Sequence, residues 1–302
     1  MATAMELKIK PACVAGTVAF LLVAASPVFP ADSPAGSNII IASTTSTENS
    51  GLLAWLLPVF QQDSGVQAKV VAVGTGQAIR LARNGDADVV LVHHRPSEES
   101  LVADGVGIER VAVMHNDFVL VGPSQDPANI GNLDDVVKAM GRISAGAQLF
   151  ASRGDNSGTH EKELELWRAA GINPVSPDGG WYRETGSGQG ATLNIASGID
   201  AYALSDRATW MKFGNKGDLK VLIEGDARLH NPYSVILINP AKYPHVNVAG
   251  GQAFVDWLVS EKGQQLIGEF TIDGRQVFFP DALQSVVQTP ESARNVTGAN
   301  TN

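Results

Sequence analysis

Short apolar runs alternate with amphipathic stretches through most of this sequence, and this pattern constrains the fold more than any other feature. In the first half of the chain the apolar runs are 38–42, 68–73, 88–92 and 118–121. Their length and content of β-branched residues are typical of buried strands. Between them, residues 51–62 and 77–84 predict helices, and Pro58 is expected to kink or shorten the first. Strands that alternate with helices predict an α/β protein with a parallel, doubly wound sheet.

The middle of the chain repeats this alternation. Residues 133–140 predict a helix behind an Asn132 cap, and residues 158–170 predict a helix that ends at Gly171. A glycine-rich turn at 186–190 is expected to open a further helix. Strands are predicted at 148–152, 201–204, 219–223 and 234–238.

Two of the apolar strands are each followed by a proline, and they indicate where the chain crosses between two lobes. We place these crossings near residues 122 and 232. Lobe 1 is then expected to contain residues 38–122 plus 233–287, and lobe 2 residues 123–232. Lobe 1 would therefore be discontinuous in sequence.

The N-terminus has the features of a secretory signal peptide. Lys8 and Lys10 precede an apolar stretch at 12–25, which is shorter than the roughly 20 residues that span a bilayer. A signal peptide is therefore predicted over 1–31, and the protein is expected in the periplasm. The single cysteine, Cys13, lies within it, before the apolar stretch, and is a poor site for lipid attachment. One cysteine also excludes an internal disulfide and a thiolate metal cluster.

The charge of the chain limits the classes of partner. With 31 Asp and Glu against 22 Lys and Arg, the formal charge is -9. Nucleic-acid binding proteins usually carry a basic surface that contacts phosphates, so no nucleic-acid partner is expected. A small anion is not excluded, because a buried site depends on its nearest donors more than on net charge. The polar tail at 288–302 is expected to be flexible.

Three loops carry donors at the carboxyl ends of predicted strands, where open α/β sheets bind ligands. The first is the hydroxyl run Ser43–Thr47, which is longer than helix capping requires. The second is Gly74–Thr75–Gly76, a weaker signal because a glycine is common in such turns. The third is Ser152–Thr159, in which Arg153 precedes the hydroxyl and N–H donors of a helix start. Arg153 either binds an anion there or simply pairs with Asp155.

The chain resembles the periplasmic tungstate-binding proteins of ABC importers, within the type II substrate-binding superfamily, over about residues 38 to 285. The segments that carry the resemblance are S-T-T-S-T at 43–47 with S-G-L-L at 50–53, V-A-V-G-T-G-Q at 71–77, G-D-A-D-V-V-L-V-H at 85–93, N-D-F-V-L-V-G-P at 116–123 and S-R-G-D-N-S-G-T at 152–159. Weaker similarity covers A-Y-A-L-S-D-R at 201–207 and N-P-Y-S-V-I-L-I-N-P at 231–240. Ser43 stands where the family more often has threonine, which keeps the hydroxyl.

The resemblance implies a two-lobe periplasmic binding protein fold of type II. Each lobe would be a mainly parallel sheet flanked by helices, with the ligand cleft between the lobes. It also implies capture of tungstate, with molybdate as a close competitor, and delivery to a membrane permease by a monomer that uses no cofactor or metal cation. The residues expected to bind the oxyanion are Thr44, Thr45, Ser46, Thr75, Gly76, Arg153, Ser157, Gly158 and Thr159.

Other functions stay open at this stage. Phosphate-binding proteins of the same superfamily carry a similar R-x-D-x-S-G-T segment, and molybdate and sulfate share the tetrahedral shape. Asp155 discriminates between them, since a carboxylate facing the ligand would select a protonated anion; we expect it instead to orient Arg153 or accept backbone N–H groups. A serine hydrolase built on Ser157 and His160 is the less favoured alternative. His93 is a candidate for lining the cleft.

Overall fold

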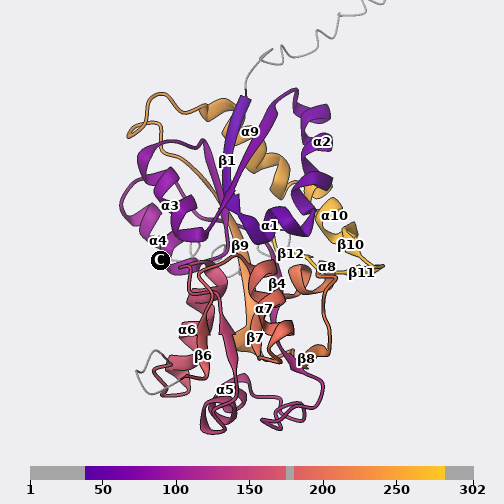
Figure 1. Cartoon of the computed structure of the whole chain (residues 1–302). Coiled ribbons are helices and arrows are strands. Elements are labelled where there is room, and N and C mark those ends of the chain that lie inside the picture. The colour runs from indigo at the N-terminus through magenta and orange to yellow at the C-terminus, as the bar shows by residue number, and fades with distance from the viewer. Residues whose placement is uncertain (1–37, 175–179, 283–302) are drawn as a thin grey trace, which may run out of the picture. The chain divides into compact units, whose positions relative to one another are not determined.

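The computed structural model describes residues 38–174 and 180–282, and in it helices alternate with strands along the chain (Figure 1). The predicted signal peptide at 1–31 and the predicted tail at 288–302 lie outside the described residues. Within the described ranges, no helix combines the length and the hydrophobicity that crossing a membrane requires.

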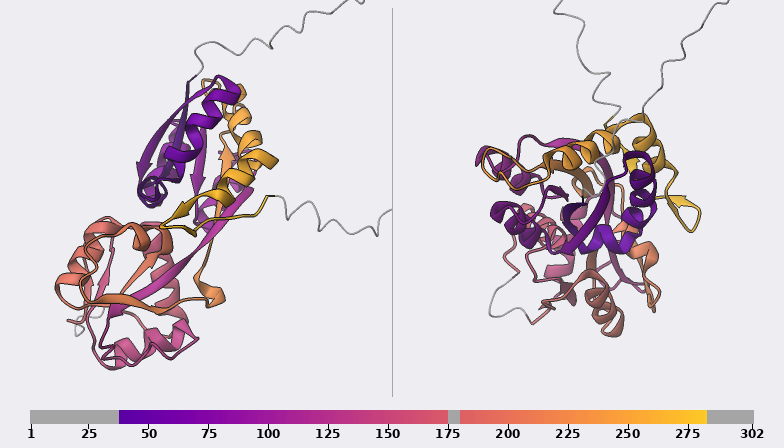
Figure 2. Two further views of the ribbon diagram at one scale, coloured as in Figure 1. Left: turned by 90° about the vertical axis from the view of Figure 1, so that its right-hand side faces the viewer. Right: turned by 90° about the horizontal axis from the view of Figure 1, so that it is seen from above.

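Lobe 1 is built from both ends of the described chain, whose indigo and yellow segments lie together in both views of Figure 2. Its elements are β1 (Asn38–Thr44), α1 (Thr45–Ser50), α2 (Leu52–Ser64), β2 (Gln67–Val73), α3 (Thr75–Asn84), β3 (Val89–Val92), α4 (Arg95–Ala103), α9 (Val248–Val259), α10 (Glu261–Glu269), β10 (Thr271–Ile272), β11 (Arg275–Gln276) and β12 (Phe279–Pro280).

Lobe 2 comes from the middle of the chain, and two long strands run between the lobes. The lobe 2 elements are α5 (Val136–Ala145), β5 (Phe150–Ser152), α6 (Gly158–Ala169), β6 (Tyr182–Glu184), α7 (Gln189–Gly198), β7 (Ala203–Asp206), α8 (Arg207–Lys212), β8 (Leu219–Ile223) and the 3-10 turn η1 (Ala227–Leu229). The shared strands are β4 (Val111–Pro123) and β9 (His230–Leu237).

The main sheet has the strand order β12-β4-β9-β3-β1-β2, and β7 and β8 pair with the C-terminal part of β4. Strand β1 pairs in parallel with β2 and β3, and β5 pairs in parallel with β6. The two shared strands pair antiparallel with all their partners, because they carry the chain between the lobes in opposite directions. The expected doubly wound parallel arrangement therefore holds around β1, and the sheet as a whole is mixed.

Strand β4 changes partner along its length. It pairs with β9 from Val111 to Asp117 and with β7 from Phe118 to Val121. The predicted lobe boundaries at residues 122 and 232 remain predictions. The change of partner between Asp117 and Phe118 lies close to the first of them.

Each lobe buries apolar side chains on both faces of its strands, which explains why the strands are continuous apolar runs. In lobe 1, Ile39 and Ile41 of β1 pack with α2 and α9 on one face, while Ala42 packs with α3 on the other. In lobe 2, Phe118 and Leu120 of β4 pack with α5 and α6. The alternate residues of β4 pack with α7. The helices thereby hold the carboxyl ends of β1 and β5 in fixed positions.

Three local predictions differ from the structure. Helix α5 begins at Val136 behind an Asp135 cap, whose side chain accepts from the Lys138 N–H at 3.0 Å, and the predicted Asn132 cap is wrong. Pro58 does not shorten α2, which continues to Ser64. The hydroxyl run is not one loop, because α1 begins within it at Thr45.

Candidate functional site

The hydroxyl run lies at the carboxyl end of β1 and the start of α1. Thr44 caps α1, because its Oγ1 accepts from the Thr47 N–H at 3.3 Å. The Thr44 Oγ1 also lies 3.0 Å from Ser46 Oγ, and both side chains are buried. Ser43 donates to the Leu91 carbonyl at 2.8 Å, so its hydroxyl links β1 to β3. Thr44 and Ser46 remain as hydroxyls that a ligand could orient, and Thr45 is half-buried.

The third predicted loop connects β5 to α6 in lobe 2. Arg153 follows directly after β5 and is only 3% exposed. Its Nη2 lies 2.5 Å from Asp155 Oδ2, while Asp155 Oδ1 accepts from the Ser157 N–H at 3.1 Å. Arg153 therefore pairs with Asp155, which is the alternative that the sequence left open beside anion binding, and Asp155 also accepts a backbone N–H, as expected. Ser157 caps α6 by accepting from the His160 N–H at 3.3 Å.

The second and third loops meet across the two lobes. The Gly158 N–H donates to Thr75 Oγ1 at 2.9 Å, and both residues are buried. A Cβ at Gly76 would lie 3.6 Å from the Asn156 carbonyl oxygen, which places Gly76 beside the same loop. The predicted donors of lobe 1 and lobe 2 therefore face one another.

Two of the predicted donors are buried without a hydrogen-bond partner among the described residues. They are Nε of Arg153 and Oγ1 of Thr159, a residue that is 1% exposed. A buried polar group without a partner is costly, by about 1–3 kcal/mol. Both atoms belong to the third predicted loop, Ser152–Thr159.

A buried glutamate of α6 is connected through hydrogen bonds to Ser152, the first residue of this loop. Glu163 of α6 accepts from the Tyr182 hydroxyl at 2.7 Å and from the Trp167 indole N–H at 3.2 Å. The Tyr182 hydroxyl also lies 2.9 Å from Ser152 Oγ, directly before Arg153. Burial raises the pKa of Glu163 to about 8, so the side chain is largely protonated at neutral pH.

His93 lies between the loops of both lobes. Its ring stacks on Tyr233 at a centroid distance of 4.6 Å, and its Nδ1 lies 2.9 Å from Asn231 Oδ1. A Cβ at Gly158 would lie 3.0 Å from its Cε1. Burial lowers the pKa of His93 to about 4, which makes the ring neutral at pH 7. The suggestion that His93 lines the cleft therefore agrees with its position.

Several polar residues near the site received no role in the sequence analysis. Asn116 and Asn231 are buried opposite each other on β4 and β9. Asp206 is 1% exposed, and its Oδ2 has no hydrogen-bond partner among the described residues. Burial raises the pKa of Asp206, and the charge of Arg153 opposes that rise. Gln189, at the start of α7, donates to the Leu204 carbonyl at 2.9 Å. Polar residues within apolar strands were the available signal for the two asparagines.

The arrangement of Ser157 and His160 is not that of a nucleophile and its base. The ring Nδ1 of His160 accepts from the Asn156 N–H at 3.1 Å, while Ser157 Oγ accepts the backbone N–H of His160. Serine nucleophiles need a ring nitrogen within hydrogen-bond reach of the hydroxyl. Within residues 38–174 and 180–282, no three His, Cys, Asp or Glu side chains gather so that they could hold a metal ion.

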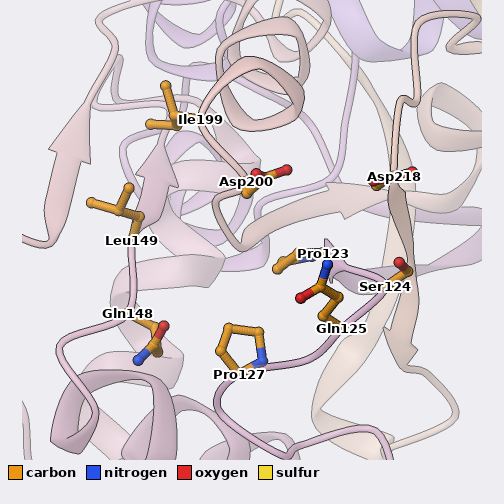
Figure 3. A pocket seen from close by; sticks show the side chains of 9 residues that line it. All are labelled: Pro123, Ser124, Gln125, Pro127, Gln148, Leu149, Ile199, Asp200 and Asp218. Atoms are coloured by element: carbon orange, nitrogen blue, oxygen red, sulfur yellow. The ribbon is translucent and has the colours of Figure 1, made fainter.

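Of the nine predicted contacts, Gly158 alone lines either of two cavities. One of about 260 Å³ borders His93 and Gly158 and receives side chains from both lobes and from β9. The other, of about 310 Å³, lies within lobe 2 at the start of β5 and the end of α7 (Figure 3). The second cavity is at the end of β5 opposite Arg153 and shares no residue with the three loops.

A mixed α/β chain of two lobes, joined by two long strands and meeting at buried donor loops, has the architecture of type II periplasmic binding proteins. In agreement with this, a family model described as a PBP superfamily domain matches residues 30–262.

Known proteins specify the family further. The tungstate-binding protein TupA of Peptoclostridium acidaminophilum is 46% identical over 83% of this chain and 88% of its own length. A solved structure titled tungstate binding protein TupA, from Desulfovibrio alaskensis G20, has a TM-score of 0.72 and 41% identity, covering 82% of this chain and 99% of that one. The structure titled tungstate ABC transporter, from Geobacter sulfurreducens, has a TM-score of 0.71 and 44% identity, covering 77% and 98%. The chain belongs to the PBP superfamily and, within it, to the TupA family.

Proposed function

We propose that this protein captures tungstate between its two lobes and delivers it to the permease of an ABC importer. The relatives that carry the name tungstate-binding protein match about four-fifths of the chain. Molybdate is the competing ligand, because the two ions share charge and shape and differ only slightly in size. The protein would act in the periplasm as a monomer, without a cofactor and without catalysing a reaction.

The observation that carries this proposal is a pair of buried donors, Arg153 Nε and Thr159 Oγ1, that have no partner within residues 38–174 and 180–282. Both are donors that an oxyanion would satisfy, and charge-assisted bonds of this kind are among the strong ones. The proposed contacts of the oxyanion are Thr44, Thr45, Ser46, Thr75, Gly76, Arg153, Ser157, Gly158 and Thr159.

The position of Asp155 favours a fully deprotonated anion. Both of its carboxylate oxygens are engaged within the loop, one with Arg153 and one with the Ser157 N–H. These two bonds hold the carboxylate against Arg153 and the loop backbone, which supports a role in orienting the loop and not in accepting a proton from the ligand. Tungstate, molybdate and sulfate carry no proton at neutral pH, whereas phosphate carries one or two.

Competitive calorimetry with tungstate, molybdate, sulfate and phosphate tests the proposal. We expect stoichiometric binding, with tungstate bound at least as tightly as molybdate and both bound more tightly than sulfate and phosphate. Phosphate bound more tightly than tungstate would contradict the proposed function.

Replacing Arg153 tests the site itself. Truncating one partner of a buried charged contact costs at least about 2 kcal/mol, so Arg153→Ala is expected to weaken tungstate binding by about 30-fold or more. The matched control is Arg168→Ala, an exposed arginine near the end of α6 that donates to the Leu164 carbonyl. Equal affinities for the wild type and Arg153→Ala would show that the anion binds elsewhere.

Phosphate is the second candidate, and Asp206 is the observation that favours it. Its Oδ2 is buried without a partner among the described residues and could accept a hydrogen bond from a protonated anion such as hydrogen phosphate. Under the tungstate proposal, Asp206→Asn leaves tungstate binding intact. Loss of phosphate binding in this variant, with phosphate the preferred ligand of the wild type, would support the second candidate.

A further inference from the structure

Four buried polar side chains form a continuous line from the shared strands to the hydroxyl run. Asn116 of β4, Asn231 of β9, His93 and Ser46 are each at most 6% exposed. The terminal atoms of Asn116 and Asn231 approach to 2.6 Å, and Asn231 lies 2.9 Å from His93 Nδ1. His93 Nε2 lies 3.4 Å from Ser46 Oγ. The ring cannot turn freely, because Tyr233 stacks on it and the Gly158 backbone packs against its edge.

The direction of these hydrogen bonds decides what Ser46 can offer a ligand. If Asn231 presents its carbonyl oxygen to His93, then Nδ1 carries the ring hydrogen and Nε2 carries a lone pair. That lone pair would accept the Ser46 hydroxyl hydrogen, so Ser46 could not donate this hydrogen to a bound anion. In the same arrangement Asn116 Nδ2 is buried with no partner among the described residues.

Exchanging the oxygen and nitrogen of both amides reverses the line without moving any other atom. Asn116 Nδ2 then donates to Asn231 Oδ1, and Asn231 Nδ2 donates to His93 Nδ1. The ring hydrogen moves to Nε2 and is donated to Ser46 Oγ. Asn116 Nδ2 gains an acceptor, and Asn116 Oδ1 takes the position that has no partner among the described residues, which is less costly because a buried carbonyl tolerates this better than an N–H group. The Tyr233 hydroxyl, 3.4 Å from Asn231, then faces an oxygen to which it can donate.

We propose that Asn116, Asn231 and His93 are positioning residues that donate in sequence toward Ser46, so that His93 does not accept the Ser46 hydroxyl hydrogen and Ser46 can donate it to the bound oxyanion. This inference rests on the proposed function, because it requires an anion at the site. Such an anion accepts hydrogen bonds and donates none, so each donor in the line must point toward it.

The neutral state of the ring makes this choice binary. Burial lowers the pKa of His93 to about 4, with smaller contributions from the charges of Arg153 and His94 and an opposing one from its hydrogen bond with Asn231. At pH 7 the ring therefore holds a single hydrogen, on Nδ1 or on Nε2. The two cases assign opposite roles to Ser46.

Nitrogen NMR of the histidine rings reads this choice directly. Protein labelled with 15N-histidine is measured at pH 7 with and without sodium tungstate, and the His93 signals are assigned by their absence in His93→Gln. In the tungstate-bound protein we expect Nε2 to have the chemical shift of a protonated nitrogen and Nδ1 that of an unprotonated one. The opposite pattern in the tungstate-bound protein overturns the inference.

Two variants separate positioning from simple space filling. In His93→Gln the amide nitrogen can replace Nε2 and donate to Ser46, whereas in His93→Asn the shorter side chain reaches only the position of Nδ1. We expect His93→Gln to bind tungstate within about 10-fold of the wild type and His93→Asn to lose about 10- to 100-fold. Equal losses in both variants, with both folded by circular dichroism, would indicate a merely structural role.

These outcomes are distinguishable from failure of the proposed function. A wild type that binds none of the four oxyanions overturns both proposals. A wild type that binds tungstate while its His93 ring is protonated at Nδ1 overturns only this inference, and Arg153→Ala then still reports on the site.

Discussion

Gly158 lies where the two lobes approach each other, and the approach requires that this residue has no side chain. Its N–H donates to Thr75 across the site, and an added Cβ would lie 3.0 Å from His93 Cε1 and 3.1 Å from Thr75 Oγ1. Those separations are shorter than ordinary van der Waals contact, so a methyl group would push the two lobes apart.

Gly158→Ala is therefore expected to weaken tungstate binding by about fivefold or more, since the closed contact loses about 1–3 kcal/mol to overpacking. Isothermal calorimetry measures this effect. Gly190→Ala is the matched control, because Gly190 also lies at a helix start and a Cβ there meets nothing within 4 Å. A loss of the same size in both variants would refute the steric explanation.

Glu163 gives a prediction about stability and pH. Burial raises its pKa to about 8 from an ordinary value of 4.5, so the folded protein binds a proton that the unfolded chain releases. The stabilisation is complete below pH 4.5 and is lost progressively as the pH rises through about 8.

Replacing Glu163 with glutamine removes this pH dependence, because the amide cannot ionise and its oxygen still accepts from Tyr182. Denaturant unfolding of Glu163→Gln and the wild type between pH 5 and 9 is expected to show the variant gaining relative stability as the pH rises. The control is Glu161→Gln, at a half-buried position in the first turn of α6. Parallel pH profiles for the wild type and Glu163→Gln would contradict the prediction.

At the scale of elements, the sequence predicted strands better than helix ends. Continuous apolar runs such as β3, where all four residues are buried, have no other favourable environment than a covered sheet. Pro58 was expected to kink or shorten α2, and α2 is not shortened. A proline inside a helix costs about 3 kcal/mol, but α2 also buries Leu52, Leu53, Leu56 and Phe60, each worth about 1.5–3 kcal/mol. Tertiary burial therefore outweighs the local penalty.

The three donor loops were predictable because each follows a strand and precedes a helix, so local sequence places them at one edge of a sheet. The residues behind them were not. Asn116, Asn231 and Asp206 are brought near the loops by pairing between β4, β9 and β7, which are far apart in sequence. A sequence pattern within ten or twenty residues does not predict pairing between strands so far apart. An asparagine in an apolar strand indicates only that its side chain needs a hydrogen-bond partner.

At the scale of the whole molecule, an acidic chain is proposed to bind a dianion. The formal charge is -9, and the arginine at the proposed site is already paired with Asp155. Long-range attraction therefore contributes little, and the affinity must come from hydroxyls, N–H groups and one guanidinium at short range. Interactions between buried groups are screened by salt much less than those between exposed charges.

Tungstate affinity is accordingly expected to change by less than about threefold between 50 and 500 mM sodium chloride, because the donors are buried. Calorimetric titrations across this range check the prediction, with the Arg153→Lys variant as a comparison that keeps the charge and loses the planar fork. A steep linear fall of log affinity with log salt would indicate that long-range charge drives binding.

The place of β9 in the sheet has a consequence for how the chain can fold as it is made. β9 lies between β3 and β4, yet it follows β4 by roughly 100 residues in the chain. At synthesis rates of about 5–20 residues per second, the central position of the lobe 1 sheet stays vacant for roughly 5–20 s after β4 has emerged. β9 can join β3 and β4 only when more than three-quarters of the protein exists, and β12 joins β4 later still. β1, β2 and β3 can pair earlier, but β3 and β4 lack their shared neighbour for much of translation.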